Sequence, residues 1–373
     1  MSAQIDVNPK LLIWAREERF GNAPLLDVAK EIKIAQEDLV KWEHDGKNVP
    51  FDALEILAKA YKRQTVVFFL PDVPQKTKKI KDFRNLVNGA EGFSPDTLLA
   101  VRRTERYLNI ARELQAESYW NQQYDWAKSF TGKKSKVEEE AKRIRDLLGS
   151  PKDGKLNKRN SDDAFRYWRK IIEEKLGIFV FQFSMPESEL DGFSYAIDHL
   201  PYAIVINNKK QAVRKTFTLF HELAHILKHN PGACKIDPLS SQEQFAIELE
   251  CNAFAGEFLV PDTTVKQVNS VDQIFEFAKE YNVSGETYLR RLFEKKKIGR
   301  QIFFQWLEEV RERSSSFPRI KREGEGGPSM LIQSKSTRGA KFFELVSNAA
   351  IANQLSYSTA ADLLGLKASS IST

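Results

Sequence analysis

The chain has 373 residues, enough for two or three domains that each bury a hydrophobic core. Hydrophobic residues make up 42% and charged residues 29%, a composition typical of a globular protein that excludes disorder and collagen-like repeats. No apolar run reaches the roughly 18 residues of a membrane span, and the first residues lack the pattern of a signal peptide. With only two cysteines, a disulfide framework is excluded, so we expect a cytoplasmic protein.

The net charge of +6 is a weak indication of nucleic-acid binding. Residues 1–70 contain ten Lys or Arg and eleven Asp or Glu, so this segment is nearly neutral. The positive surplus lies in later runs, such as residues 76–81 and 133–136, and runs of this kind are usually solvated linkers.

Four short amphipathic helices are predicted between residues 8 and 70. Their apolar positions are Leu11, Leu12 and Ala15; Val28, Ala29 and Ile32; Leu39, Val40 and Trp42; and Leu54, Leu57, Ala58 and Tyr61. Turn residues at 45–46 and 48–50 separate the third helix from the fourth. Pro71 and Pro74, followed by a basic run, indicate a boundary, so we place the first domain at residues 1–75.

The middle of the chain combines helices with two apolar strands. Helical patterns extend from 95 to 149, and a further helix is expected from Asp162 or Asp163 to Leu176. Strands are predicted at 178–181 and 202–206, where β-branched and aromatic residues follow one another. Helices then follow at roughly 213–229, 241–258, 271–280 and 284–296.

The C-terminal part is expected to begin with an irregular segment. Residues 311–338 are rich in Ser, Gly, Pro and charge, which predicts a linker or an exposed loop, and a last helical pair lies near 339–365. We therefore expect an α+β, mostly helical fold in four parts. These are the first domain at 1–75, a helical linker region at 76–160, a domain with a small β-sheet at 161–300, and a linker plus C-terminal helical segment at 301–373.

His221, Glu222 and His225 form an H-E-x-x-H pattern in the helix after the second strand. Residues four apart lie one turn apart on one helix face, so both imidazoles can bind one Zn²⁺ while Glu222 takes a proton from a water molecule. Apolar neighbours predict that this helix is mostly buried, and buried polar side chains need partners. The alternative to a zinc site is a hydrogen-bonded triad in the core.

A zinc hydrolase needs a third protein ligand and an open fourth position for water. Lys228 and Pro231 stand where the metzincin pattern has Gly and His, which excludes that subclass. Further potential ligands are expected at a helix end or in the core: His229, Cys234 and Cys251. The remaining source is the helix 241–258, in which Glu248 or Glu250 would complete a His₂Glu site.

The direction of the side chains distinguishes Glu248 from Glu250. At 100° per residue the two point about 200° apart, so only one can face the metal. Glu250 shares its stripe with Glu243 and Glu257, which predicts a solvated face. The stripe of Glu248 is mostly apolar and contains Phe245, Asn252, Ala255 and Leu259. We therefore expect Glu248 to be the third ligand and Asn252 to fix the tautomer of an imidazole. The alternative is that Glu248 pairs with a surface Lys or Arg.

Residues 215–225 (KTFTLFHELAH) and 248–261 (ELECNAFAGEFLVP) resemble the ImmA/IrrE-type metallopeptidases. The strand ending at Asn207 and the helix at 283–292 are similar to that family too. The resemblance implies a gluzincin-like zinc endopeptidase, whose relatives cleave or inactivate DNA-binding repressors under stress or in mobile elements. It implies that His221, His225 and Glu248 bind zinc and that Glu222 is the catalytic base.

Residues 24–61 resemble an XRE-type helix-turn-helix, which many members of that family carry in front of the protease. The matching positions are 27–32, 39–43, Gly46, Pro50 and 54–58. Lys33 stands where a turn Gly is usual, and Glu37 and Asp38 at the start of the reading helix would face phosphates unfavourably. We therefore expect this module to recognise a protein or to serve as a dimerisation or sensing platform, with DNA as the alternative partner. Residues 342–366 resemble the helical end of longer members.

The expected reaction is hydrolysis of a peptide bond in a protein substrate, in which Zn²⁺ lowers the pKa of its water and Glu222 passes the proton to the leaving amine. The strand 202–206 is expected to pair with an extended substrate. Candidates for the oxyanion donor precede the metal-binding helix: Tyr195, His199 and Tyr202. The competing hypothesis is a DNA-binding repressor or antitoxin-like regulator with a non-catalytic zincin domain.

Overall fold

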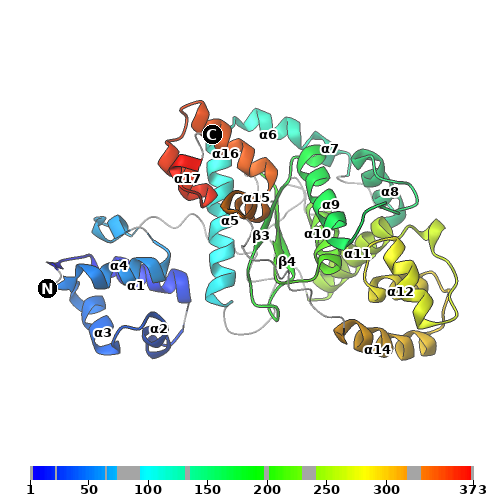
Figure 1. Ribbon diagram of the computed structural model, residues 1–373, viewed down its shortest axis with the longest axis horizontal. Coiled ribbons are helices and arrows are strands. Elements are labelled where there is room, and N and C mark those ends of the chain that lie inside the picture. Colours follow the sequence, from blue (N-terminus) through cyan, green and yellow to red (C-terminus); the bar gives the residue numbers. More distant parts are fainter. Residues whose placement is uncertain are drawn as a thin grey trace. The chain divides into compact units, whose positions relative to one another are not determined.

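A computed structural model describes residues 3–21, 23–63, 65–73, 93–130, 135–196, 201–228, 241–316 and 329–370 of the chain. The chain forms two compact units, Met1–Arg103 and Thr104–Thr373 (Figure 1). Both are built mainly from helices and each contains one small sheet, which confirms the expected α+β, mostly helical fold. No described helix is both long and apolar enough to span a membrane. The four-part domain division stays a prediction.

The first unit is a bundle of short helices around one hydrophobic core. Its elements are β1 (Gln4–Ile5), α1 (Pro9–Phe20), α2 (Leu25–Ile32), α3 (Gln36–Asp45), β2 (Val49–Pro50), α4 (Phe51–Tyr61) and the 3-10 helix η1 (Thr65–Phe69). All four predicted helices are present, and their apolar positions form the core, apart from Val40, which is 48% exposed. Helix α5 (Pro95–Leu114) begins in this unit and continues into the second.

Two positions end α2 and α3 in the left-handed backbone conformation. Lys33, where the sequence lacks the usual Gly, has φ 59° and ψ 42°, so the turn between α2 and α3 forms without glycine. Gly46 has φ +69°, and a Cβ there would lie 2.1 Å from the carbonyl oxygen of Val7. The close contact therefore requires glycine at 46, whereas the turn at 33 tolerates a lysine.

The second unit contains a three-stranded sheet in the order β3-β5-β4. The strands are β3 (Phe179–Phe183), β4 (Gly192–Tyr195) and β5 (Ala203–Asn207). Central strand β5 runs parallel to β3, with Phe179 opposite Ala203, and antiparallel to β4, with Tyr195 opposite Ala203. Every residue of β3 and β5 is buried, as expected where helices cover both faces of a sheet.

Helices pack on both faces of this sheet (Figure 1). The further helices of the unit are α6 (Glu117–Gln123), α7 (Asp125–Lys128), α8 (Val137–Leu148), α9 (Ser161–Leu176), α10 (Ala212–Lys228), α11 (Ser241–Leu259), α12 (Val271–Glu280), α13 (Gly285–Glu294), α14 (Arg300–Ser316), α15 (Met330–Arg338), α16 (Ala340–Ile351) and α17 (Tyr357–Leu364), with the 3-10 helices η3 (Asp262–Thr264) and η4 (Ala368–Ser370). Helices α9 and α10 contact one face, and α15 contacts β3. The predicted helices from 162 to 296 and the final pair are confirmed to within a few residues.

The prediction of a linker or exposed loop at 311–338 is wrong at both ends. Helix α14 continues to Ser316 and α15 occupies Met330–Arg338, while residues 317–328 lie outside the described part of the chain. Ser334 is buried and donates a 2.6 Å hydrogen bond to the carbonyl oxygen of Leu364. The polar composition that suggested a loop is therefore accommodated by a contact with the last helix.

Buried contacts join the C-terminal helices to the sheet. The ring of Phe342 on α16 stacks on Tyr107 at 4.6 Å and meets Phe181 of β3 edge-on. Beside them the buried carboxylate of Glu173 accepts hydrogen bonds from the backbone N–H groups of Val180 and Ala340. The C-terminal segment thus shares the hydrophobic core of the unit that carries the H-E-x-x-H helix.

Candidate metal centre

Helix α10 follows β5 and carries the H-E-x-x-H residues in a largely buried position. Its apolar face is fixed by the buried side chains Leu219, Phe220, Leu223, Ala224, Ile226 and Leu227. Strand β4 crosses close to this helix at Gly192, where a Cβ would lie 2.7 Å from Cγ2 of Thr218. The packing therefore leaves one side of α10 to face α11, and this side presents His221 and His225.

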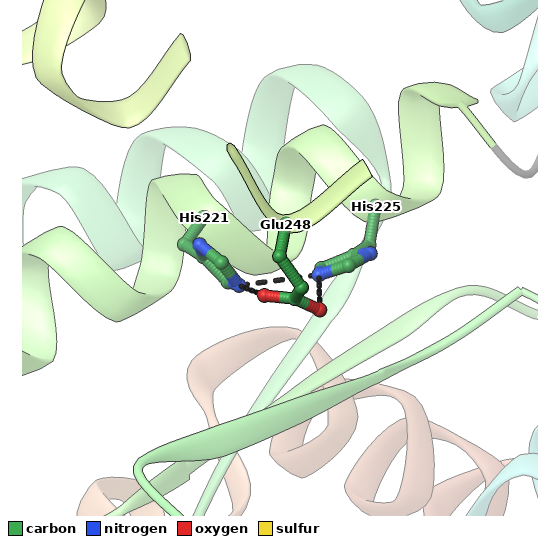
Figure 2. Close-up of side chains that lie close together, drawn as sticks. All are labelled: His221, His225 and Glu248. Atoms are coloured by element: carbon green, nitrogen blue, oxygen red, sulfur yellow. Dashed lines mark hydrogen bonds and ion pairs between the residues drawn. The ribbon is translucent and has the colours of Figure 1, made fainter. Parts of the chain in front are cut away.

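Helix α11 brings Glu248 between the two imidazoles (Figure 2). The Nε2 atom of His221 lies 3.2 Å from Oε2 of Glu248, and Nε2 of His225 lies 3.2 Å from Oε1. The two Nε2 atoms are 3.1 Å apart. Among the described residues these three side chains form a group whose potential ligand atoms all lie within 4.8 Å of one another.

This donor set fits a zinc ion. In a tetrahedral site with metal–ligand distances of about 2.0–2.2 Å, neighbouring donor atoms lie about 3.3 Å apart. The two Nε2 atoms, 3.1 Å apart, are close to that value, and each of them lies 3.2 Å from a different oxygen of Glu248. Two Nε2 atoms that face each other also need a proton or a cation between them, because each neutral ring nitrogen without a hydrogen carries a lone pair. Two imidazoles and one carboxylate would leave a fourth position open.

Asn252 orients one of the rings. Its side-chain Oδ1 lies 3.1 Å from Nδ1 of His221, and because an amide oxygen only accepts, Nδ1 is the donor. The Nε2 atom of His221 is then left with its lone pair directed at the cluster. The position of Asn252, one turn after Glu248, agrees with the role expected from the sequence, which stays a prediction.

The electrostatics of the cluster come from carboxylates beside the imidazoles. Burial alone would lower the pKa of His221, but its hydrogen bond with Glu248 and the charges of Glu222 and Glu248 raise it above its usual value. In turn, hydrogen bonds with His221 and His225 hold the pKa of Glu248 well below its ordinary range. The site therefore attracts positive charge, either as protons on the imidazoles or as a metal ion.

Glu222 lies beside this cluster without being part of it. Glu222 is 8% exposed, and its side chain forms no hydrogen bond or ion pair with any other described residue. Its charge acts on both His221 and Cys251, so the carboxylate lies near the junction of α10 and α11. The charge of Glu222 thus adds to the negative potential around His221, and its role as catalytic base stays a prediction.

Two predictions about the faces of α11 are wrong. Phe245, expected on a buried stripe with Glu248, is 65% exposed. Glu257, expected on a solvated face with Glu250, is 3% exposed and pairs with the buried Arg291. The reason is that α11 packs against α8 and α13 as well as α10, so its buried surface is wider than one stripe and turns along the helix.

Glu250 points away from the cluster, as the 200° argument predicts. Its carboxylate lies 2.7 Å from Nζ of Lys228, at the end of α10, and Lys228 also lies 3.7 Å from Glu140 on α8. In the sequence Lys228 only excluded the metzincin pattern, and its contact with Glu250 was not predicted. Its position three residues after His225, at the end of the same helix, was the available indication.

The other candidates of the sequence lie in the core or outside the described residues. Cys251 is fully buried, as expected, and burial raises the pKa of its thiol. Tyr195 donates a 2.8 Å hydrogen bond from its hydroxyl to Glu105, and the ring of Tyr202 stacks on Tyr124. Both tyrosines are buried and held by other partners, so neither is placed to donate to an oxyanion. His199, His229 and Cys234 lie outside the residues that the structure describes.

The predicted pairing of a substrate with strand 202–206 is wrong. This strand is β5, which is hydrogen-bonded to β3 on one side and to β4 on the other. Among the described strands of this sheet, β3 and β4 are the edges.

Comparison with known proteins finds one family model that matches the part of the chain that carries this site. Residues 173–293 match Peptidase_M78, the IrrE N-terminal-like domain, and the matched range contains all of β3 to α11. The chain is also 36% identical over 87 residues to the "Uncharacterized immunity region protein 2" of Bacillus phage phi105. That match spans 22% of this chain and 53% of the phage protein, about half of the relative's length. No solved structure matches.

These findings support a metallopeptidase-like domain at residues 173–293 and bear out the ImmA/IrrE-type resemblance for this part of the chain. The helix-turn-helix resemblance of residues 24–61 lies outside the matched range and stays a prediction.

Proposed function

We propose that the second unit is a zinc-dependent endopeptidase that hydrolyses a repressor-type regulatory protein. The observation that carries this proposal is the convergence of His221, His225 and Glu248, whose potential ligand atoms all lie within 4.8 Å of one another. These are residue types that bind zinc in catalytic sites. The match to Peptidase_M78 supports the peptidase activity.

Glu222 and Asn252 have different roles in the proposed reaction. Zinc, when bound, would lower the pKa of a water molecule at the open position and polarise the scissile carbonyl. Glu222 then accepts the proton of that water and delivers it to the nitrogen of the leaving amine, so that the carboxylate is restored at the end of the cycle. Asn252 holds the ring of His221 in one tautomer throughout.

The sheet offers an edge for the substrate backbone. Among the described strands β4 is at one edge of the sheet beside β5, and it lies against α10. An extended peptide added beside β4 would gain backbone hydrogen bonds in the way of β-augmentation. Strand β4 thus takes the role first expected of 202–206.

The substrate class rests on the relative from a phage. That protein is named for a phage immunity region, and the ImmA/IrrE-type resemblance of residues 215–225 and 248–261 implies repressors as substrates. We therefore extend the proposal to a repressor-type protein as the substrate.

The test compares the wild type with Glu222→Gln. Each purified protein is assayed for zinc content, and each is co-expressed with candidate repressors whose fragments are identified by mass spectrometry. We expect about one zinc per chain in both proteins, and fragments only with the wild type. Loss of zinc from Glu222→Gln would contradict the role of base. Zinc in both proteins with intact repressors and unchanged repression would instead favour the DNA-binding regulator with a non-catalytic zincin domain.

A further inference from the structure

Helix α11 exposes two large apolar side chains beside the metal centre. Phe245 is 65% exposed and Leu249 is 54% exposed. They are four residues apart, so they lie one turn apart on the same side of α11. Two neighbouring large apolar side chains that are both exposed are a candidate binding surface.

This pair belongs to the side of the helix that carries Glu248. At 100° per residue, Phe245 lies about 60° and Leu249 about 100° around the helix from Glu248, in the same sense as Asn252 at about 40°. Because Glu248 and Asn252 both contact His221, the apolar pair lies at the rim of the metal centre.

The other sides of α11 are already in use. Glu250 pairs with Lys228, and Glu257 pairs with Arg291 in the interior. Phe254 and Phe258 are buried, and Phe258 stacks on Phe220 of α10 at 3.9 Å. The large apolar side chains that α11 exposes are therefore the two that border the cluster, Phe245 and Leu249.

The second helix of the site has an apolar neighbour as well. Phe217 on α10 is partly buried, and its ring stacks on His221 with 6.4 Å between the centroids. Apolar side chains thus accompany the metal-binding residues on both helices. The carboxylate of Glu250, which faces away from the cluster, pairs with Lys228. These surroundings offer apolar contacts to a substrate side chain next to the metal-binding residues.

We propose that Phe245 and Leu249 receive an apolar side chain of the substrate next to the scissile bond, so that cleavage occurs beside Leu, Ile, Met or Phe. The inference rests on the proposed peptidase function and names its sequence preference. Burial of an apolar side chain in such a contact changes kcat/KM by about 10- to 100-fold relative to a polar residue of similar size.

The first test profiles cleavage sites in a mixture of peptides of defined sequence, with the zinc-loaded full chain. We expect the wild type to favour apolar residues at one position flanking the cut, and Phe245→Ser and Leu249→Ser to lose this preference with unchanged zinc content. Phe304→Ser is the matched control, because Phe304 on α14 is 51% exposed but lies outside α10 and α11. Unchanged preference and unchanged kcat/KM in both α11 variants would overturn the proposal.

A second test does not depend on hydrolysis. The full-length Glu222→Gln variant is titrated with two fluorescein-labelled peptides that differ only at the central residue, which is Leu in one and Ser in the other. Fluorescence anisotropy measures the binding of each peptide. We expect tighter binding of the Leu peptide, and loss of the difference when Phe245→Ser is added. Equal binding of both peptides would overturn the apolar surface, whereas normal discrimination by a chain whose wild type cleaves nothing would overturn the peptidase function alone.

Discussion

Helix α10 of the second unit and helix α3 of the first use polar residues in opposite ways. On α10, Glu222 and His225 are buried, and the imidazoles converge with Glu248 of another helix. On α3, Glu37 and Asp38 are exposed, at the end of the helix where a DNA-binding module would meet phosphates. Buried polar groups must be paired, so their pattern in the sequence restricts the chemistry, whereas exposed ones leave it open.

The largest expected effect comes from the buried imidazoles. His225→Ala should remove the bound zinc and lower proteolysis by at least about 10³-fold, because a two-ligand site loses both affinity and the activated water. His44→Ala, the same substitution at an exposed position of α3, should change neither. Metal analysis and a peptidase assay check both variants, and removal of zinc by a chelator should reproduce His225→Ala. Full zinc content in His225→Ala would refute the assignment.

The next effect separates two glutamates on one helix. Glu248→Gln should lose zinc, with affinity falling about 100-fold or more, because the neutral amide is a poor replacement for a carboxylate ligand. Glu250→Gln should keep its zinc, because Glu250 pairs with Lys228 on another side of α11. Zinc content after dialysis against a competing chelator measures both. The opposite result, an empty site only in Glu250→Gln, would show that α11 faces α10 with a different side.

Buried and exposed charges should also differ in stability. Arg291 is 3% exposed, pairs with Glu257 and donates to the carbonyl oxygen of Val260 at 3.0 Å. Arg291→Met therefore removes the closer of two buried guanidinium partners of Glu257, and Arg145 at 3.7 Å remains. We expect this change to lower the free energy of unfolding by about 1.5–3 kcal/mol, the contribution of a hydrogen bond between charged groups. Arg290→Met, which breaks a pair with Glu286 on the helix surface, should cost about 0.5 kcal/mol or less.

Urea unfolding of the second unit, followed by tryptophan fluorescence, measures these two changes. Similar urea midpoints for Arg291→Met and Arg290→Met would show that the buried ion pair stabilises the fold no more than the surface pair does.

Helices were predicted correctly where the apolar periodicity and the residues that begin and end the helix lie within the helix itself or next to it. Helix α12 occupies the predicted range 271–280, and α9 and α10 differ from their predicted bounds by a residue or two. Strand β4 was missed because four residues give little pattern, and it is defined by pairing with β5. Helix α15 was missed because Ser334 is paired with Leu364, 30 residues away, a contact that composition does not reveal.

The site shows the same limit. The sequence was sufficient to place His221 and His225 on one face and to select Glu248 over Glu250, and the structure brings the selected three together. The supporting stripe argument failed at Phe245 and Glu257, because the partners that bury Glu257 lie on α8 and α13. Periodicity describes one helix, whereas the surface that each side chain meets depends on elements that are distant in sequence.

The smallest expected effect concerns DNA binding by the first unit. Lys33 follows α2 and Lys41 lies on α3, both exposed, and they are the cations that a duplex would meet at the α2–α3 turn. If they contacted phosphates, each Lys→Ala change would reduce the slope of log affinity against log salt concentration by about 0.9. We expect Lys33→Ala and Lys41→Ala to leave both affinity and slope of the full chain unchanged, because Glu37 and Asp38 offset them. Gel shifts over a salt series measure the slope. A slope lowered by about one in either variant would assign DNA to this face, and would make the exposed charges of α3 as functional as the buried ones of α10.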